Sequence, residues 1–183
     1  MIKQMTLARI TLFTYVIILS FAMQSCGVAP RTLGTYIEDH SIASQAKKII
    51  KDSDYTESNF SVQAHAFNEV LLLTGEIARE KNRIDLFDRI ADIPKVRQIH
   101  NEISIGNPIT NRTKLSDRFI KSKIKSKILF KNIAKRREVK IICRNGTVYL
   151  MGLINDTKAA KLTTIVRETR GVNSVVTLLE TTK

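Results

Sequence analysis

The chain has 183 residues, 43% of them hydrophobic, which is ordinary for a folded protein and allows one or two small domains but no more. Its formal net charge of +13 is not ordinary, and it is unevenly distributed. Residues 110–183 hold 18 Lys and Arg against 5 Asp and Glu, whereas residues 31–109 hold 10 against 12. This asymmetry indicates that one domain contacts a polyanion and the other has a different role.

Residues 1–25 have the pattern of an export signal. Lys3 and Arg9 form a charged start, and residues 10–23 are an apolar run of the length of a signal core, short for a membrane span. Cys26 follows this run and a small residue, which resembles the lipobox of bacterial lipoproteins. The resemblance implies cleavage before Cys26 and acylation of its sulfur and new amino group. The alternative is an uncleaved anchor helix with an incidental cysteine, and under either interpretation the rest of the chain leaves the cytoplasm.

Residues 26–36 contain Pro and Gly without periodicity and are predicted to be a lipidated tether. Acyl chains contribute about 0.8 kcal/mol per buried methylene, so several chains anchor a protein firmly without a spanning helix. By the usual sorting rule for such lipoproteins, the absence of Asp after Cys26 implies release to the outer membrane.

The pattern of residues 37–106 predicts a first domain. Apolar residues at helical spacing, alternating runs and turn residues give its elements. In order, they are a helix at 37–51, a strand at 60–66, a tight turn at Asn68 and Glu69, a strand at 70–77, a helix at 79–92 that Pro94 ends, and a strand at 96–105.

Residues 107–114 are predicted to be a polar linker, after which residues 115–183 repeat the pattern as a second domain. Asn145 and Gly146 predict a hairpin turn, because both tolerate positive φ. The expected elements are a helix at 116–131, strands at 139–143 and 147–154, a helix at 156–169 capped by Asp156, and a strand at 172–181.

The two halves match residue by residue, at offsets that fall from 78 to 76 along the chain. Leu71, Leu73 and Gly75 correspond to Val148, Leu150 and Gly152 at an offset of 77. Such small changes of offset are typical of a tandem duplication with loop changes. Each unit is small and buries only a modest core, so we expect the two units to pack together.

The helix at 116–131 is the most informative segment. Ser116 is predicted to cap it, with Asp117 at the positive end of its dipole. Ile120, Ile124 and Ile128 lie on one side, while Phe119 and Phe130 lie near the opposite side among several lysines. The pattern suits a helix that meets an anionic, partly apolar surface such as a phospholipid bilayer. The alternative is that neighbouring loops cover both rings and the lysines are only a solvated face.

Each half also contains a Val-x-Leu-x-Gly-type hairpin strand, a helix and a Val-x-x-Val-type strand. These stand at residues 71–75 and 96–99, and again at 148–152 and 172–175. The pattern resembles the BON domain, and two copies behind a lipobox resemble the outer-membrane lipoproteins of Gram-negative bacteria that carry two such domains. The resemblance implies an α+β fold of two tandem BON-type domains, each a helix, hairpin, helix and strand with two helices packed on a small three-stranded mixed sheet.

The resemblance further implies that the second domain binds anionic phospholipid, phosphatidylglycerol or cardiolipin, through its first helix. An aromatic residue near the helix start enters the membrane, and Phe119 stands there without the indole N–H of the family's residue. The expected phospholipid-binding residues are Phe119, Ser122, Lys123, Ser126, Lys127 and Phe130, and the patch is expected to extend over Arg136, Arg137, Lys140 and Arg144. The first unit has His40 and Ser41 at the matching place, so no second lipid site is expected there.

No catalytic or metal-binding pattern is found. His40, His65 and His100 are scattered, and none lies three or four residues from another His or from a Cys. His65 has outward parity in its strand and is expected to be solvated, whereas Cys143 faces inward and is expected to be a small buried hydrophobe. No phosphate loop, nucleophile elbow or paired carboxylates occur, so neither an enzyme nor a cofactor is expected.

Two functions remain at this point. One is a lipid-anchored module on the periplasmic face of the outer membrane that binds anionic phospholipid and supports envelope integrity. The other is a periplasmic adaptor that uses the same basic patch to bind an acidic protein, with the outer-membrane protein assembly machinery as one candidate. The charge alone would also allow nucleic-acid binding, but the export signal argues against it.

Overall fold

The computed structural model describes residues 32–53 and 60–181. The predicted signal peptide, Cys26 and most of the predicted tether lie outside these residues. Within the described part of the chain, no helix is both long and apolar enough to cross a membrane.

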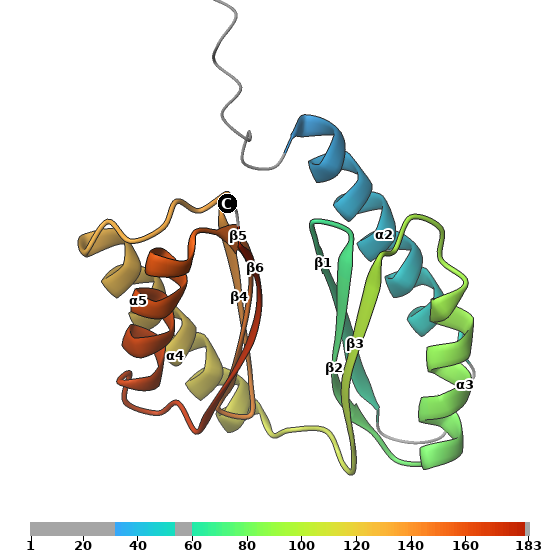
Figure 1. Cartoon of the computed structure of the whole chain (residues 1–183). Helices are drawn as coiled ribbons and strands as arrows, with labels where there is room; N and C mark the ends of the chain where they lie inside the picture. The colour runs from blue at the N-terminus through green and yellow to red at the C-terminus, as the bar shows by residue number, and fades with distance from the viewer. Residues whose placement is uncertain (1–31, 54–59, 182–183) are drawn as a thin grey trace, which may run out of the picture.

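The described chain runs through the order helix, strand, strand, helix, strand twice (Figure 1). The first unit consists of α2 (Leu33–Lys51), β1 (Ser61–Phe67), β2 (Val70–Ile77), α3 (Glu80–Ala91) and β3 (Gln98–Ile105). The second consists of α4 (Asn111–Phe130), β4 (Val139–Arg144), β5 (Thr147–Ile154), α5 (Asp156–Arg167) and β6 (Ser174–Thr181).

Each unit contains a three-stranded mixed sheet. The central strand β2 pairs antiparallel with β1 and parallel with β3, and β5 pairs in the same way with β4 and β6. The parallel pairs need a crossover connection, which α3 and α5 supply. The predicted α+β fold class, with two helices on a small mixed sheet in each unit, is therefore confirmed.

The helices bury their apolar side against one face of their own sheet. In the first unit, Ile42, Ala46 and Ile50 of α2 pack with Leu71 and Leu73 of β2. In the second unit, the predicted stripe of Ile120, Ile124 and Ile128 packs with Val148 and Leu150 in the equivalent core. The duplication therefore preserves the core positions, as the sequence offsets predict.

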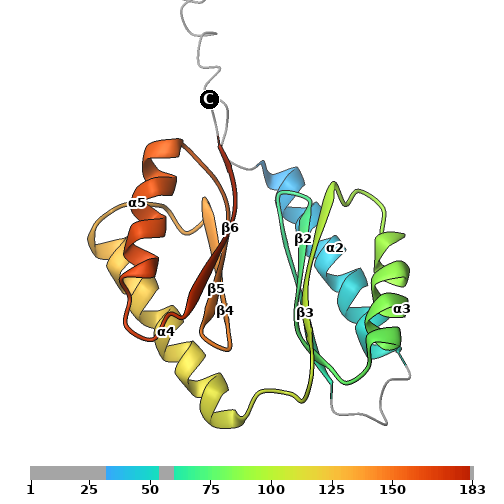
Figure 2. The same cartoon turned by 60° about the horizontal axis from the view of Figure 1, so that its bottom comes forward.

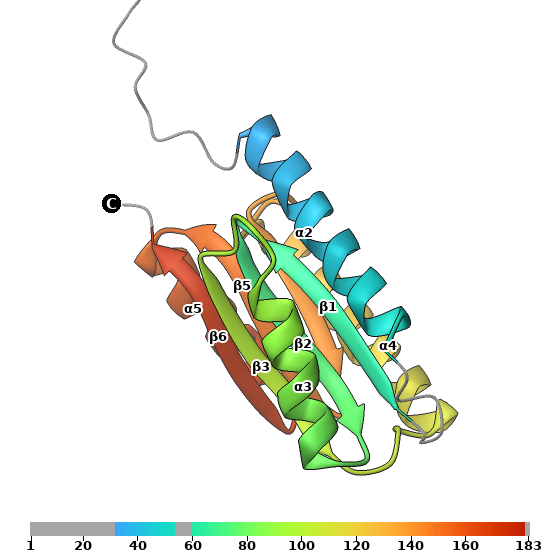
Figure 3. The ribbon, with the colours of Figure 1, turned by 90° about the vertical axis from the view of Figure 1, so that its right-hand side faces the viewer.

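The other faces of the two sheets pack against each other. Phe67, Val70 and Leu72 of the first unit form one cluster with Ile142, Tyr149 and Met151 of the second. The sheets lie face to face in the middle of the molecule, with α2 and α3 outside one and α4 and α5 outside the other (Figures 1 and 2). Seen from the side of α3, the strands of the second sheet run behind those of the first (Figure 3). The expected packing of the two units is thus confirmed.

Polar contacts close two edges of this interface. Arg144 of β4 donates from Nε to Glu76 Oε1 at 2.9 Å and from Nη2 to the Ser61 carbonyl at 2.9 Å. Arg97 donates from Nη2 to Glu180 Oε1 at 2.7 Å. Arg144 and Glu76 are both buried, so their pairing satisfies charges that would otherwise be costly.

One aspartate in each unit holds the hairpin turn. Asp39 of α2 accepts hydrogen bonds from the backbone N–H groups of Asn68 and Glu69, each at 2.8 Å. Asp117 of α4 accepts from Asn145 at 2.8 Å and from Gly146 at 2.9 Å. The turn residues have positive φ, as expected. Asp117 therefore holds the hairpin turn of its own domain by hydrogen bonds. Because α4 begins at Asn111, Asp117 does not lie in the first turn of the helix, and its predicted role at the positive end of the helix dipole is wrong.

The starts of three helices differ from the prediction. Helix α4 begins at Asn111, inside the predicted linker, because the Thr110 side chain accepts from the Thr113 N–H; Ser116 is not its cap. Helix α2 begins at Leu33, inside the predicted tether, with Thr32 in the same role. Helix α5 is capped by Asn155 rather than by Asp156.

Candidate functional site

Helix α4 has one face in the core and one face in solvent. Ile120, Ile124 and Ile128 are buried. Phe119 is 60% exposed and Phe130 is 94% exposed. Within residues 32–53 and 60–181 no loop covers either ring, so the alternative in which neighbouring loops bury both of them is wrong.

Two further apolar side chains on α4 are exposed, and the sequence analysis missed both. Leu115 is 51% exposed and lies one helical turn before Phe119 on the same side. Leu129 is 80% exposed and precedes Phe130. Leu115 was missed because the predicted helix began at Ser116; its spacing of four residues from Phe119 was the available signal.

The polar side chains expected to join the rings fall into two groups. Ser122, Lys123 and Ser126 are exposed on the same side as Phe119. Lys127 is half-buried and donates from Nζ to Thr169 Oγ1 at 3.0 Å, so its amine is turned toward the end of α5. The structure therefore places five of the six expected side chains on one exposed surface and turns the sixth to its flank.

Among the residues that the structure describes, no carboxylate pairs with the lysines of α4. Burial lowers the pKa of Lys121, and the neighbouring ammonium group of Lys125 lowers it further. The lysines therefore present a positive field that an anionic surface would neutralise.

Two residues expected to extend the patch belong elsewhere. Arg144 is buried between the units against Glu76, so it is not part of an exposed basic surface. Lys140 donates from Nζ to the Ala66 carbonyl of the first unit at 3.0 Å. Arg136 and Arg137 are exposed as expected.

His65 is half-buried, which differs from the solvated position predicted from its parity. The outward face of β1 is covered by the second unit, and His65 Nε2 is buried there with no hydrogen-bond partner. Burial, followed by the charges of Lys140, Lys121, Lys47 and Arg144, lowers the pKa of His65 to about 3. The imidazole is therefore neutral at physiological pH.

Cys143 packs beside the second core, which confirms its inward parity. Its Sγ lies 3.4 Å from Asp117 Oδ1. Burial and the Asp117 charge raise the pKa of this thiol to about 12. Within residues 32–53 and 60–181, no group of three or more His, Cys, Asp or Glu side chains is placed to hold a metal ion.

Comparison with known proteins identifies both halves of the chain. The BON domain matches residues 38–107 and 116–183. The chain is 31% identical over 153 residues to the 21 kDa hemolysin of Actinobacillus pleuropneumoniae, which covers 83% of this chain and 78% of that protein. It is 24% identical over 147 residues to the outer membrane lipoprotein DolP of Haemophilus influenzae, which covers 80% of this chain and 76% of that one.

Among solved structures, the C-terminal domain of CdsD, a structural protein of the Chlamydia trachomatis type III secretion system, is similar at 16% identity and a TM-score of 0.31. That match covers 79% of this chain and 67% of the other, and at this TM-score it carries no argument. The two domain matches cover most of the chain and coincide with the two repeated units of the structure. The protein belongs to the BON-domain family, with two BON domains in tandem.

Proposed function

We propose that this protein is an outer-membrane lipoprotein whose second BON domain binds anionic phospholipid through the exposed face of α4. Acyl chains on Cys26 hold it at the periplasmic face of the membrane, where it supports envelope integrity. The observation that carries the proposal is the pair of uncovered rings, Phe119 and Phe130, on a basic helix whose opposite side is buried. The relative named as an outer membrane lipoprotein supports the location.

The physical basis is a combination of an apolar wedge and a positive field. Burying a Phe side chain that is exposed in solution gains roughly 1.5–3 kcal/mol. Each Lys near an anionic membrane surface adds about 1 kcal/mol at low ionic strength. The sum of a few such free-energy contributions gives only weak binding to the membrane. Weak binding is enough for the proposed function, because acyl chains on the same molecule keep the helix close to the membrane.

A flotation assay tests this function. The acyl-free chain of residues 27–183, which contains every residue of the three hydrophobic clusters, is mixed with vesicles of phosphatidylcholine alone or with phosphatidylglycerol. We expect binding only to the anionic vesicles, weakened as salt rises because the charges are screened. Phe119→Glu is expected to abolish binding while the circular dichroism spectrum stays unchanged. Wild-type binding by this variant would contradict the proposal.

The exposed basic face also fits an acidic protein partner, including a component of the outer-membrane protein assembly machinery. Such an adaptor uses the lysines of α4 but gains little from Phe119 and Phe130 in the absence of lipid. Failure to bind anionic vesicles would favour this second function. We propose neither a catalytic role nor a cofactor for the chain.

A further inference from the structure

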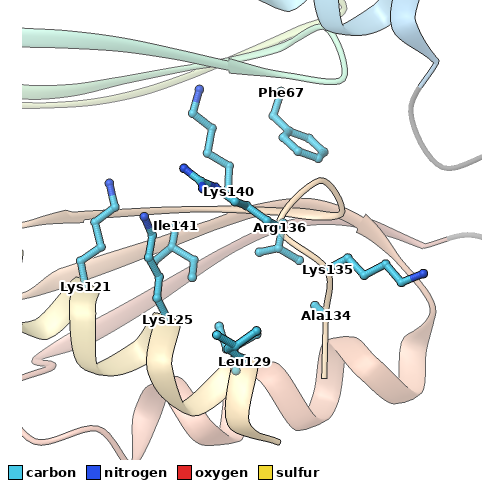
Figure 4. A pocket seen from close by; sticks show the side chains of 11 residues that line it. Phe67, Lys121, Lys125, Leu129, Ala134, Lys135, Arg136, Lys140 and Ile141 are labelled. Atoms are coloured by element: carbon cyan, nitrogen blue, oxygen red, sulfur yellow. The ribbon is translucent and has the colours of Figure 1, made fainter. Parts of the chain in front are cut away.

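A basic cleft lies on the flank of α4 that faces the first unit (Figure 4). Its volume is about 450 Å³, which is in the range of small-molecule sites. Side chains of α4, of the loop after it and of β4 line the cleft, and Phe67 at the end of β1 completes it. The cleft is therefore built almost entirely from the second BON domain, and Phe67 of the first domain borders it.

The cations are grouped around one part of this cleft. Lys121 and Lys125 project side by side from α4, and Arg136 and Lys140 lie next to them, whereas Lys135 points away (Figure 4). Among the described residues, no Asp or Glu side chain lines the cleft. Glu138, which lies close by in sequence, accepts from the Lys135 N–H and pairs with Lys158 at 3.4 Å.

Two pKa shifts have burial as their largest cause and neighbouring cations as the next. Lys121 has a lowered pKa, caused first by burial and then by the Lys125 ammonium group. The lowered pKa of His65 has burial as its first cause and the Lys140 and Lys121 charges as the next two. An anion between these groups would relieve their mutual repulsion.

The rest of the cleft is apolar. Phe67 from the first unit and Ile128, Val139 and Ile141 from the second form its walls. Leu129 lies at the side of α4 and is 80% exposed, next to Phe130. Leu129 is therefore an exposed apolar side chain at the cleft that directly precedes Phe130 in the sequence.

The presence of both cations and apolar side chains in the cleft determines which class of anionic ligand fits it. Inorganic phosphate would use the cations and leave the apolar walls without a partner. An acidic peptide would need donors for its backbone, which these side chains do not offer in a regular array. A phosphate attached to a hydrocarbon uses both parts of the cleft.

We propose that the cleft beside α4 holds the phosphate headgroup and adjoining apolar atoms of one anionic phospholipid molecule. The phosphate lies among Lys121, Lys125 and Arg136, the apolar atoms contact Leu129, and the remaining acyl chains stay in the bilayer. This inference rests on the proposed function, because α4 must first reach the membrane surface. It adds recognition of a single lipid molecule to the contact made by Phe119.

A soluble lipid separates the cleft from the membrane contact. Dihexanoyl phosphatidylglycerol, kept below its critical micelle concentration, is titrated into the acyl-free chain and followed by amide chemical shifts. Dihexanoyl phosphatidylcholine and inorganic phosphate are the comparison ligands. We expect saturable shifts at Ala134 and Val139 with the anionic lipid, at least tenfold weaker binding of phosphate and no saturation with phosphatidylcholine.

Variants assign the binding to the cleft. Lys125→Ala with Arg136→Ala removes two exposed cations, and we expect roughly fivefold weaker binding for each, about 25-fold together. Lys161→Ala with Arg167→Ala, a pair of exposed cations on α5, is the charge-matched control and is expected to change affinity less than twofold.

The results separate the two proposals. Absence of saturable shifts in the cleft, phosphate binding as tight as lipid binding, or an unaffected Lys125→Ala/Arg136→Ala variant would overturn the inference. If the cleft fails these tests but Phe119→Glu abolishes vesicle binding, the proposed membrane contact of α4 is supported and the lipid site in the cleft is rejected. If wild type ignores anionic vesicles but binds the soluble lipid as described, the cleft stands and the membrane contact of α4 is wrong.

Discussion

The two BON domains share a scaffold and differ in what their first helix exposes. Helices α2 and α4 are both capped by a Thr, and both use an Asp, Asp39 or Asp117, to hold the hairpin turn. Their buried isoleucines occupy equivalent positions. The exposed side is free of these constraints, so it is where the two copies have diverged.

The two helices differ in where their exposed apolar side chains lie and in how many lysines surround those side chains. Ser41 stands in α2 where Phe119 stands in α4. The exposed apolar residues of α2, which are Leu33, Tyr36 and Ile37, are confined to its first turns, where there is no lysine. Helix α4 carries its exposed Phe119 and Phe130 along its length among lysines. This difference supports the proposal that the second copy binds the membrane, while the sheet of the first copy packs against that of the second.

The largest difference in stability between the copies is expected at the paired glycines Gly75 and Gly152. Gly75 has φ +135, and a Cβ there would lie 2.0 Å from the Ser61 carbonyl oxygen. A Cβ at Gly152 would lie 2.8 Å from the Glu138 carbonyl oxygen. Gly75→Ala is expected to cost more than about 4 kcal/mol of unfolding free energy and Gly152→Ala about 2 kcal/mol. Urea denaturation measures both, and equal losses would refute the expected asymmetry.

The interface between the copies is the next target. Arg144→Met leaves the carboxylate of Glu76 buried without its partner and is expected to cost about 3 kcal/mol. Adding Glu76→Leu removes that unpaired charge, so the double variant is expected to recover most of the loss. Thermal and urea unfolding of the single and double variants form the test. A double variant as unstable as Arg144→Met would show that the ion pair is not the cause.

The two aspartates that hold the hairpin turns, Asp39 and Asp117, are expected to contribute equally to the free energy of unfolding. Asp39→Ala and Asp117→Ala each leave two backbone N–H groups without their acceptor, at an expected cost of about 2 kcal/mol each. Unfolding free energies of both variants provide the measurement. A loss in one copy only would show that the shared geometry is not used equally.

The last expected effect is confined to acidic pH. Folded His65 has a pKa of about 3, against about 6.5 in the unfolded chain, so the unfolded state binds more protons between these values. Stability is therefore expected to fall as the pH drops from about 6.5, by up to about 1.4 kcal/mol per pH unit. His65→Ile, which introduces the residue found at Ile142 in the second copy, is expected to remove this contribution. Identical acid unfolding curves for the variant and wild type would contradict it.

The repeat made much of this fold predictable. Periodicity and turn residues located the hairpins, the crossover helices and the core positions, because each copy confirms the other. Helix starts were missed because the first turn of α4 buries no apolar stripe: Leu115 faces solvent, and the buried pattern begins only near Ile120. Thr32 caps α2 and Thr110 caps α4, and their repetition at an offset of 78 was a signal that could have located both helix starts.

The site was predictable only where it lies on one helix. Phe119 and Phe130 follow from the pitch of α4. The surroundings of His65 and Arg144 do not follow from strand parity, because alternation identifies two faces without showing that another domain covers the second. The basic cleft was missed because its cations come from α4, from the loop after it and from β4, which only the folded structure brings together.

The chain has no tryptophan, so Phe119→Trp provides a single fluorescence reporter at the residue on which the proposed membrane contact depends. With vesicles that contain phosphatidylglycerol, we expect its emission to shift to shorter wavelength and to be quenched by brominated acyl chains, and with phosphatidylcholine alone to stay unchanged. The matched Ser41→Trp variant is expected to show neither change. An emission spectrum at position 119 that ignores anionic vesicles, or an equal shift at position 41, would contradict the claim that the second domain inserts α4 into the membrane.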